Sequence, residues 1–222
     1  LEGMVAATFP PMDENGDVNL SVIDKYADWI ASTPIKGVFV CGTTGEFSSL
    51  TIDERKLILE KWLVSARKRF KVIAHVGSNC QRSAMELARH AAQVGADAIA
   101  SIAPSFFKPG TVDELVDFFA PICHSAAGLP FYYYNMPSIT GVNLPVDKFL
   151  VEGKKKIPNL VGTKFTHNNL MEMGVCIELE QHRFEVLHGY DEILISGLAM
   201  GAVAGVGSTY NYIPNVYQAI FY

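Results

Sequence analysis

The sequence predicts an α/β protein folded as a (β/α)8 barrel, the TIM barrel, and three observations lead to this prediction. Short apolar runs rich in strand formers alternate with longer segments of helical periodicity along the whole chain. Most of the strand-like runs are apolar nearly throughout, as expected for strands covered on both faces. The length of 222 residues also exceeds the roughly 200 residues at which such barrels begin.

Eight segments are expected to be strands, namely residues 3–9, 37–41, 72–76, 98–103, 130–134, 160–165, 184–188 and 202–207. Strict alternation of strands and helices requires parallel pairing through right-handed crossovers. Eight such repeats close most naturally into a barrel. An open doubly wound sheet is the alternative, but no Gly-x-Gly-x-x-Gly motif follows the first strand.

Helical spacing of apolar residues is clearest in residues 52–63 and 84–94. Thr51 and Glu54 predict a capping box at the start of the first helix, and Gly95 ends the second. The eighth helix is expected from Ile213 onward and stops at Tyr222 after barely two turns. We therefore expect one barrel domain over residues 1–222, truncated in the eighth helix.

Composition and charge exclude several classes of protein. The chain is 49% hydrophobic and 18% charged, which suits a well-buried globular protein. A net charge of −5 argues against nucleic-acid binding, and the basic run 154–156 reads as a solvated helix end. No apolar run reaches the roughly 18 residues that cross a bilayer.

The cysteines and the start of the chain bear on location. Cys41, Cys80, Cys123 and Cys176 form no close pair and sit in or beside apolar segments, so we expect buried free thiols. Such thiols are typical of a reducing compartment. The chain opens without a signal peptide, and we expect a cytoplasmic protein.

Lys164 is the most distinctive polar residue, a lone cation near the end of the apolar run 159–165. Placing a lysine at the mouth of a buried strand costs free energy. Burial favours the neutral amine, which is the nucleophilic form and can make a Schiff base with a carbonyl. The alternative is that Lys164 extends to solvent at the strand end.

Other polar side chains follow the strand ends, where barrel enzymes carry their chemistry. The run GTTGE at 42–46, taken to lie directly ahead of a helix, could hold an anion through Thr43 and Thr44, or the threonines could simply cap that helix. Tyr134 is expected near Lys164 if the fifth and sixth strands are neighbours, whereas Tyr132 and Tyr133 are better explained as core.

The last two strand ends carry acids and hydroxyls. Asp191 and Glu192 would suit hydrogen bonds to a polyol, or would cap the seventh helix. The eighth strand ends in Gly-Ser-Thr at 207–209. His75 is expected to pack within the third strand, whereas His167, three residues after Lys164, keeps a possible role in the site. The run 13–17 reads as a turn, and no residue set has metal-ligand spacing.

These strand ends, in this order, resemble the N-acetylneuraminate lyase and dihydrodipicolinate synthase family of class I aldolases. The matching pieces span the chain: GTTGE at 42–46, YNMP at 134–137, GTKF at 162–165, and GYDE at 189–192 with Gly207 and Ser208. The resemblance implies that Lys164 forms the Schiff base and Tyr134 donates and accepts protons. It also implies that Thr43 and Thr44 hold the keto-acid carboxylate.

Within that family the resemblance is closer to the sialic acid lyases. Dihydrodipicolinate synthases carry an arginine where this chain has Ile139, which cannot bind a second carboxylate. The sialic acid lyase pattern implies that the sugar is held by the set Gly189, Asp191, Glu192 and Ser208, with Thr166 beside the bond that breaks. The resemblance thus implies cleavage of N-acetylneuraminate to N-acetylmannosamine and pyruvate, with no metal or organic cofactor.

Two departures from the family pattern stand out. Some relatives carry a tyrosine that reaches a neighbouring subunit's site, where this chain has Phe106 and Phe107, which have no hydroxyl. The family also continues past the barrel with further helices, which are absent from this sequence. The resemblance also implies that the chain forms a homo-oligomer, namely a homotetramer.

Two other functions stay open as alternatives. The chain could be another pyruvate aldolase, acting on a deoxy keto-sugar acid, or a non-catalytic barrel subunit. A phosphosugar isomerase is a more distant alternative.

Overall fold

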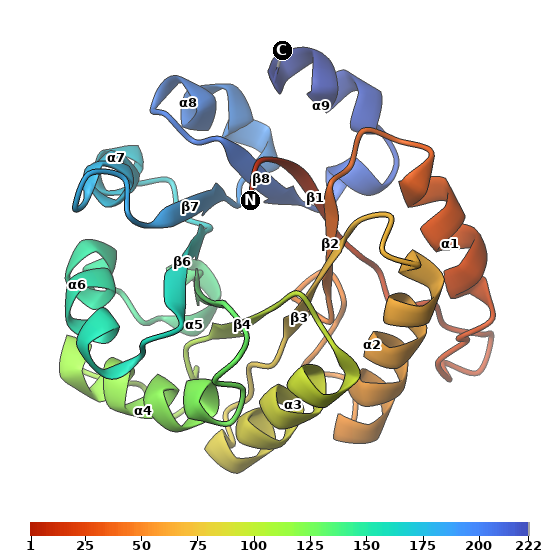
Figure 1. The fold of residues 1–222 in the computed structure, drawn as a ribbon, viewed down its shortest axis with the longest axis horizontal. Helices are drawn as coiled ribbons and strands as arrows, with labels where there is room; N and C mark the ends of the chain where they lie inside the picture. The colour runs from red at the N-terminus through yellow and green to blue at the C-terminus, as the bar shows by residue number, and fades with distance from the viewer. Residues whose placement is uncertain (222) are drawn as a thin grey trace.

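The computed structural model describes residues 1–221, and the strands in this range close into one parallel barrel (Figure 1). They follow one another around the barrel in chain order, and β8 pairs with β1. Their bounds are β1 Gly3–Ala7, β2 Gly37–Val40, β3 Lys71–His75, β4 Ala98–Ile102, β5 Phe131–Asn135, β6 Leu160–Phe165, β7 Glu185–His188 and β8 Ala204–Gly207. All the predicted strands are confirmed, each within two residues at either end.

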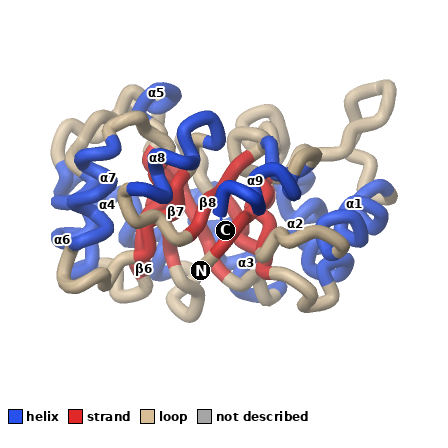
Figure 2. Tube along the Cα trace, turned by 90° about the horizontal axis from the view of Figure 1, so that it is seen from above, coloured by secondary structure: helices blue, strands red, loops and turns tan. Residues whose placement is uncertain are grey.

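The helices form a ring outside the strands, and the side view shows the strands enclosed between them (Figure 2). Within residues 1–221 the α-helices are α1 Val22–Ala31, α2 Ile52–Ala66, α3 Gln81–Val94, α4 Val112–His124, α5 Pro137–Thr140, α6 Val146–Lys156, α7 Leu170–Glu178, α8 Leu194–Ala199 and α9 Pro214–Phe221. Two 3₁₀ turns, η1 Asp191–Ile193 and η2 Thr209–Asn211, follow β7 and β8. The predicted final helix is confirmed, although Tyr222 lies outside the described residues.

Two apolar layers hold the barrel, one inside it and one between strands and helices. The alternation of strand side chains separates them, since Tyr132 and Tyr134 join the inner layer while Tyr133 joins the outer one. In the outer layer the ring of Tyr133 lies 4.6 Å from that of Phe149 on α6. The expected alternation along β5 is therefore confirmed.

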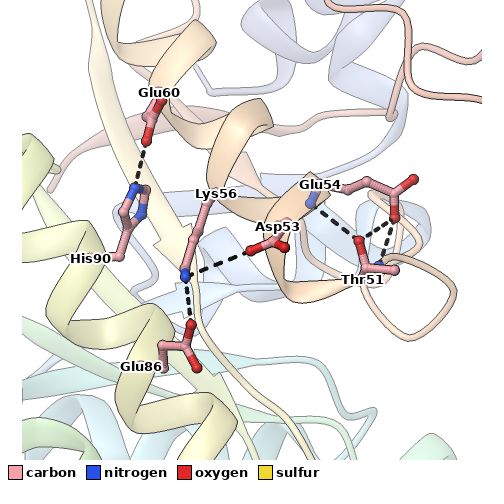
Figure 3. A network of polar contacts seen from close by, with 7 residues as sticks. All are labelled: Thr51, Asp53, Glu54, Lys56, Glu60, Glu86 and His90. Carbon is pink, nitrogen blue, oxygen red and sulfur yellow. Dashed lines mark hydrogen bonds and ion pairs between the residues drawn. The ribbon is translucent and has the colours of Figure 1, made fainter.

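Helix α2 begins where the sequence predicts. The Thr51 hydroxyl accepts from the Glu54 N–H, and the Glu54 carboxylate accepts from the Thr51 N–H, so the capping box is confirmed (Figure 3). Two ion pairs join α2 to α3: Lys56 pairs with Glu86, and Glu60 with His90 (Figure 3). Such exposed pairs contribute about 1 kcal/mol or less each. The same helix carries Arg55, a buried arginine.

Three smaller expectations are confirmed. Residues 13–17 form a turn, in which the Asp13 carboxylate accepts from the backbone N–H groups of Asn15 and Asp17. The basic run 154–156 ends α6, as predicted. Gly95 ends α3 in the left-handed conformation, also as predicted. No helix within residues 1–221 is long and apolar enough to cross a membrane.

The cysteine prediction was wrong for one residue. Cys41, Cys123 and Cys176 are buried free thiols, but Cys80 is exposed. It occupies the N-cap position of α3, at the end of a loop that faces solvent. An apolar neighbourhood in the sequence does not bury a residue at the junction between a loop and a helix.

Candidate active site

Lys164 lies in β6 directly beside Tyr134 of β5, and only 4% of the lysine is exposed. Its Nζ is 4.1 Å from the centre of the Tyr134 ring and 4.4 Å from that of Phe39 on β2. Both rings belong to the inner layer, so the lysine side chain enters the barrel. The alternative that Lys164 extends into solvent is wrong.

An irregularity in β6 creates this pairing. Phe131 pairs with Leu160, but Tyr132 pairs with Gly162, so the register shifts by one residue at the start of the strand. Without that shift Tyr134 would face residue 163 instead of Lys164. The alignment of the phenol with the amine thus depends on one extra residue in β6.

No carboxylate within residues 1–221 forms an ion pair with Lys164. Its charged form is stabilised by the two ring faces, an interaction that contributes about 2 kcal/mol when desolvated. No ion pair has to be broken for the nitrogen to bond to a carbon atom. This arrangement suits a covalent nucleophile better than a structural cation.

Tyr134 connects Lys164 to the loop after β2. Its phenol oxygen lies 3.1 Å from the Thr43 Oγ1, and either oxygen can donate the proton. The phenol also lies 3.1 Å from the sulfur of Met136. Thr44, in the same loop, is half-buried. The structure therefore brings Thr43, Tyr134 and Lys164 together in one chain of contacts.

The expectation that this loop lies directly ahead of a helix was wrong. Residues 41–50 form successive turns, and α2 begins only at Ile52 with Thr51 as its cap. Thr43 and Thr44 therefore do not cap the helix, which removes the structural alternative for them.

Thr166 and Gly189 follow β6 and β7 and lie against each other. The Thr166 N–H donates to the Asn135 carbonyl at 2.8 Å, and the Gly189 N–H donates to the Phe165 carbonyl at 2.9 Å. The hydroxyl of Thr166 is buried and has no hydrogen-bond partner among the described residues. A buried hydroxyl without a partner costs about 1–3 kcal/mol.

Asp191 is buried and connects the loops after β7 and β8. Its Oδ2 accepts from the Thr209 N–H at 2.9 Å and from the Thr209 hydroxyl at 2.6 Å. Its Oδ1 has no partner among residues 1–221 and lies against Gly207, where a Cβ would come within 1.7 Å. The interpretation that Asp191 caps the seventh helix was wrong, because its bonds cross to the next loop.

The remaining candidates differ in exposure. Ser208 is half-buried, and its carbonyl accepts from the Asn211 side chain at 2.7 Å, whereas Glu192 is exposed. His167 is half-buried beside the ring of Phe165, which belongs to the outer apolar layer. The structure does not join His167 to the contacts around Lys164.

Sequence reasoning missed two polar residues. Arg55 projects from α2 and is 4% exposed, and Thr209 supplies both bonds to Asp191. Thr209 could have been found from its place at the end of the eighth strand. Arg55 resembles the other cations of its helix, so only the path of α2 reveals its role. Within residues 1–221, no three His, Cys, Asp or Glu side chains are grouped as a metal would require.

Comparison with known proteins identifies the family of this chain. Residues 1–222 match the description "Dihydrodipicolinate synthetase family". The chain belongs to this family. N-acetylneuraminate lyase from Homo sapiens is 45% identical over 216 residues, which cover 96% of this chain and 68% of that protein. The enzyme of the same name from Gallus gallus is 47% identical, with coverage of 96% and 70%.

Solved structures in the family share the fold closely. N-acetylneuraminate lyase from Proteus mirabilis has a TM-score of 0.96 at 38% identity, covering 98% of this chain and 74% of its own. A sialic acid aldolase from Ruminococcus gnavus, described as a catalytic lysine mutant, has a TM-score of 0.93 at 28% identity, covering 99% and 72%. The chain thus spans about seven tenths of the length of these relatives.

Two buried histidines predict how stability depends on pH. Burial lowers the pKa of His75 well below its ordinary value and also lowers that of His188. At a pH below about 6.5 the unfolded chain binds protons that the folded chain does not, so acid removes stability. We expect the free energy of unfolding, measured with urea, to fall between about pH 7 and about pH 5.

The variant His75→Asn is the control for this prediction, because it removes one of the two titrating groups. Its stability should fall less steeply over the same range. A stability that is constant over this range, or an unchanged slope in the variant, would contradict the assignment of the acid sensitivity to these histidines.

Proposed function

We propose that this chain is a class I aldolase that cleaves N-acetylneuraminate to N-acetylmannosamine and pyruvate through a Schiff base on Lys164. The observation that carries the proposal is the Lys164 Nζ, buried beside the Tyr134 ring at 4.1 Å and without a carboxylate partner within residues 1–221. The names of the relatives support the choice of substrate.

Schiff-base formation would begin when the neutral Lys164 amine attacks the C2 ketone of the open-chain sugar. The carbonyl oxygen takes up a proton to give a carbinolamine, which then loses water to leave an iminium. Tyr134 would carry these protons, because its ring lies against the amine and its hydroxyl contacts that of Thr43. The lysine supplies the covalent chemistry, so the reaction needs no organic cofactor.

Carbon–carbon cleavage would follow when the C4 hydroxyl loses its proton. The electrons of the C3–C4 bond move into the iminium, which gives an enamine of pyruvate and frees the aldehyde of N-acetylmannosamine. Protonation of C3 and hydrolysis then release pyruvate and restore the amine. Thr166, Tyr134 or the substrate carboxylate would take the C4 proton.

Substrate binding would use the loops around the strand ends. Thr43 and Thr44 would hold the keto-acid carboxylate, since both lie on the loop that contacts Tyr134. Gly189, Asp191, Glu192 and Ser208 would hold the polyhydroxyl chain. The unpartnered Thr166 Oγ1 and Asp191 Oδ1 support a ligand rich in hydroxyls, which would satisfy both atoms.

Assembly and location complete the proposal. The chain would form a homotetramer in the cytoplasm, and the buried free thiols at Cys41, Cys123 and Cys176 support a reducing compartment. Ile139 is 58% exposed on α5 and offers no charge to a second carboxylate, which disfavours a dihydrodipicolinate synthase. An aldolase for another deoxy keto-sugar acid is the nearest alternative.

Borohydride trapping tests the covalent step. Reduction in the presence of pyruvate should attach a pyruvate-derived group to Lys164, located by peptide mass mapping. Lys164→Ala should abolish the adduct and the lyase activity. Lys108→Ala is the control, since Lys108 is an exposed lysine in the loop after β4 and should trap normally. An adduct on any other lysine would overturn the mechanism.

Removal of the Tyr134 hydroxyl tests the proton relay. Tyr134→Phe keeps the ring against Lys164 but loses the contact with Thr43, so kcat should fall about 10²- to 10⁴-fold. Tyr133→Phe is the matched control, because its ring lies in the outer layer, and its kcat should be unchanged. Equal rates in the two variants would exclude Tyr134 as the proton carrier.

Asp191 distinguishes the sugar substrates. Asp191→Ala should slow condensation of pyruvate with N-acetylmannosamine by about tenfold or more, the effect of losing a hydrogen bond to a charged group. Condensation with a short aldehyde should change little. Thr209→Val controls for loosening of the loop, because it removes one of the bonds that hold the carboxylate. Equal losses on both aldehydes after Asp191→Ala would favour the alternative substrate.

A further inference from the structure

His75 ends β3 and bonds to the strands on both sides of it. Its side chain is buried, with 3% of the residue exposed. The ring Nδ1 lies 2.8 Å from the carbonyl oxygen of Cys41, and the Ile102 N–H points at Nε2 at 3.3 Å. A carbonyl can only accept and an N–H can only donate, so Nδ1 carries the proton. One ring thus joins the ends of β2, β3 and β4.

The Cys41 carbonyl is the point where the chain leaves β2 for the loop that carries Thr43 and Thr44. Cys41 has a φ of 54° and Glu46 a φ of 50°, so non-glycine residues in the left-handed conformation stand at both ends of this turn. Such conformations cost about 1 kcal/mol or more and persist only where the surroundings fix them. The bond from His75 fixes the first of them.

The same ring contacts the aromatic side chains beside Lys164. The His75 ring lies 5.8 Å from the ring of Tyr134 and 5.9 Å from that of Phe39. Gly77 permits this position, because a Cβ there would come within 2.7 Å of the His75 Nε2. One side chain, that of His75, therefore contacts both the loop of Thr43 and the rings of Tyr134 and Phe39. It lies outside the chain of contacts that runs from Thr43 to Lys164.

Arg55 fixes the backbone of His75. Its guanidinium donates to the His75 carbonyl at 2.8 Å and to the Gly77 carbonyl at 2.9 Å, and it lies 5.5 Å from the centre of the Phe47 ring. No carboxylate within residues 1–221 pairs with Arg55. Burial, the Arg55 charge and the Lys164 charge lower the pKa of His75, so its ring is neutral at neutral pH.

We propose that His75 is a positioning residue whose Nδ1–H bond to the Cys41 carbonyl sets the loop of Thr43 and Thr44 for a keto-acid carboxylate. The inference rests on the proposed function, because it assigns that loop to the carboxylate of pyruvate. A residue that only fills space would have no need of a donor at Nδ1. The two roles therefore differ in which substitutions the site tolerates.

Two variants separate the roles. An asparagine amide can replace Nδ1 and keep the donor to Cys41, whereas a glutamine amide reaches the place of Nε2 and loses it. Glutamine is nearer to histidine in volume. A positioning role therefore predicts that His75→Asn keeps the KM for pyruvate within about threefold, while His75→Gln raises it about tenfold or more, the effect of one buried hydrogen bond. The kcat should change less than KM in both.

Kinetics that reverse this order, or an equal KM in the two variants, would overturn the proposal, since a space-filling role favours the larger glutamine. The readout that does not need activity is hydrogen exchange of residues 41–50. Exchange there should be faster in His75→Gln than in His75→Asn. Equal exchange in the two variants would overturn the proposal for His75. Failure of the wild-type protein to trap pyruvate would overturn only the proposed function, so the two failures can be told apart.

A measurement on the wild-type protein covers the case in which a variant does not fold. The ¹⁵N shifts of the His75 ring report its tautomer at neutral pH. Protonation at Nδ1 is expected. A ring protonated at Nε2 would leave Cys41 without its donor and would overturn the proposal.

Discussion

The contact of the Lys164 amine with two aromatic faces is the constraint on which the rest of the site depends. Phe39 and Tyr134 come from β2 and β5, which are not neighbours in the sheet, so only closure of the barrel brings both rings to one nitrogen. The outer helices keep the barrel closed by burying the outward faces of its strands. The nucleophile is thus a product of the whole ring of strands and not of a local motif.

Around this centre, some buried polar groups fix the shape of loops and others are available to a ligand. Arg55 and His75 use their hydrogen bonds on backbone carbonyls and so fix the shape of loops. The two carboxylate oxygens of Asp191 differ in role. One accepts hydrogen bonds from Thr209 and so fixes a loop, whereas the other has no partner within residues 1–221 and is available to a ligand. Burying an oxygen without a hydrogen-bond partner costs free energy, and at the strand ends a bound ligand could supply the missing partner.

The fold could be predicted from the sequence because apolar runs of strand length alternate with helical periods, and only a few topologies satisfy that pattern. That Tyr134 lies near Lys164 was expected from the adjacency of β5 and β6, but the register shift that pairs the two residues was not. Other features could not be predicted, because they depend on the direction of a side chain at the end of an element. Asp191 crosses to the next loop, Arg55 turns inward from its helix, and Cys80 faces solvent.

The register shift at the start of β6 has a consequence for how this barrel can vary over evolution. The extra residue there is Val161, three residues before Lys164 on the same strand, and it sets which residue of β6 pairs with Tyr134. Insertions and deletions are tolerated in surface loops. Within β6, deletion of Val161 would only remove the irregularity and keep Tyr134 opposite Lys164, whereas deletion of Thr163 would place Phe165 opposite Tyr134 while every other side chain of the site stays in the sequence. Alignments of distant homologues should therefore treat a gap at Thr163 as a change of chemistry.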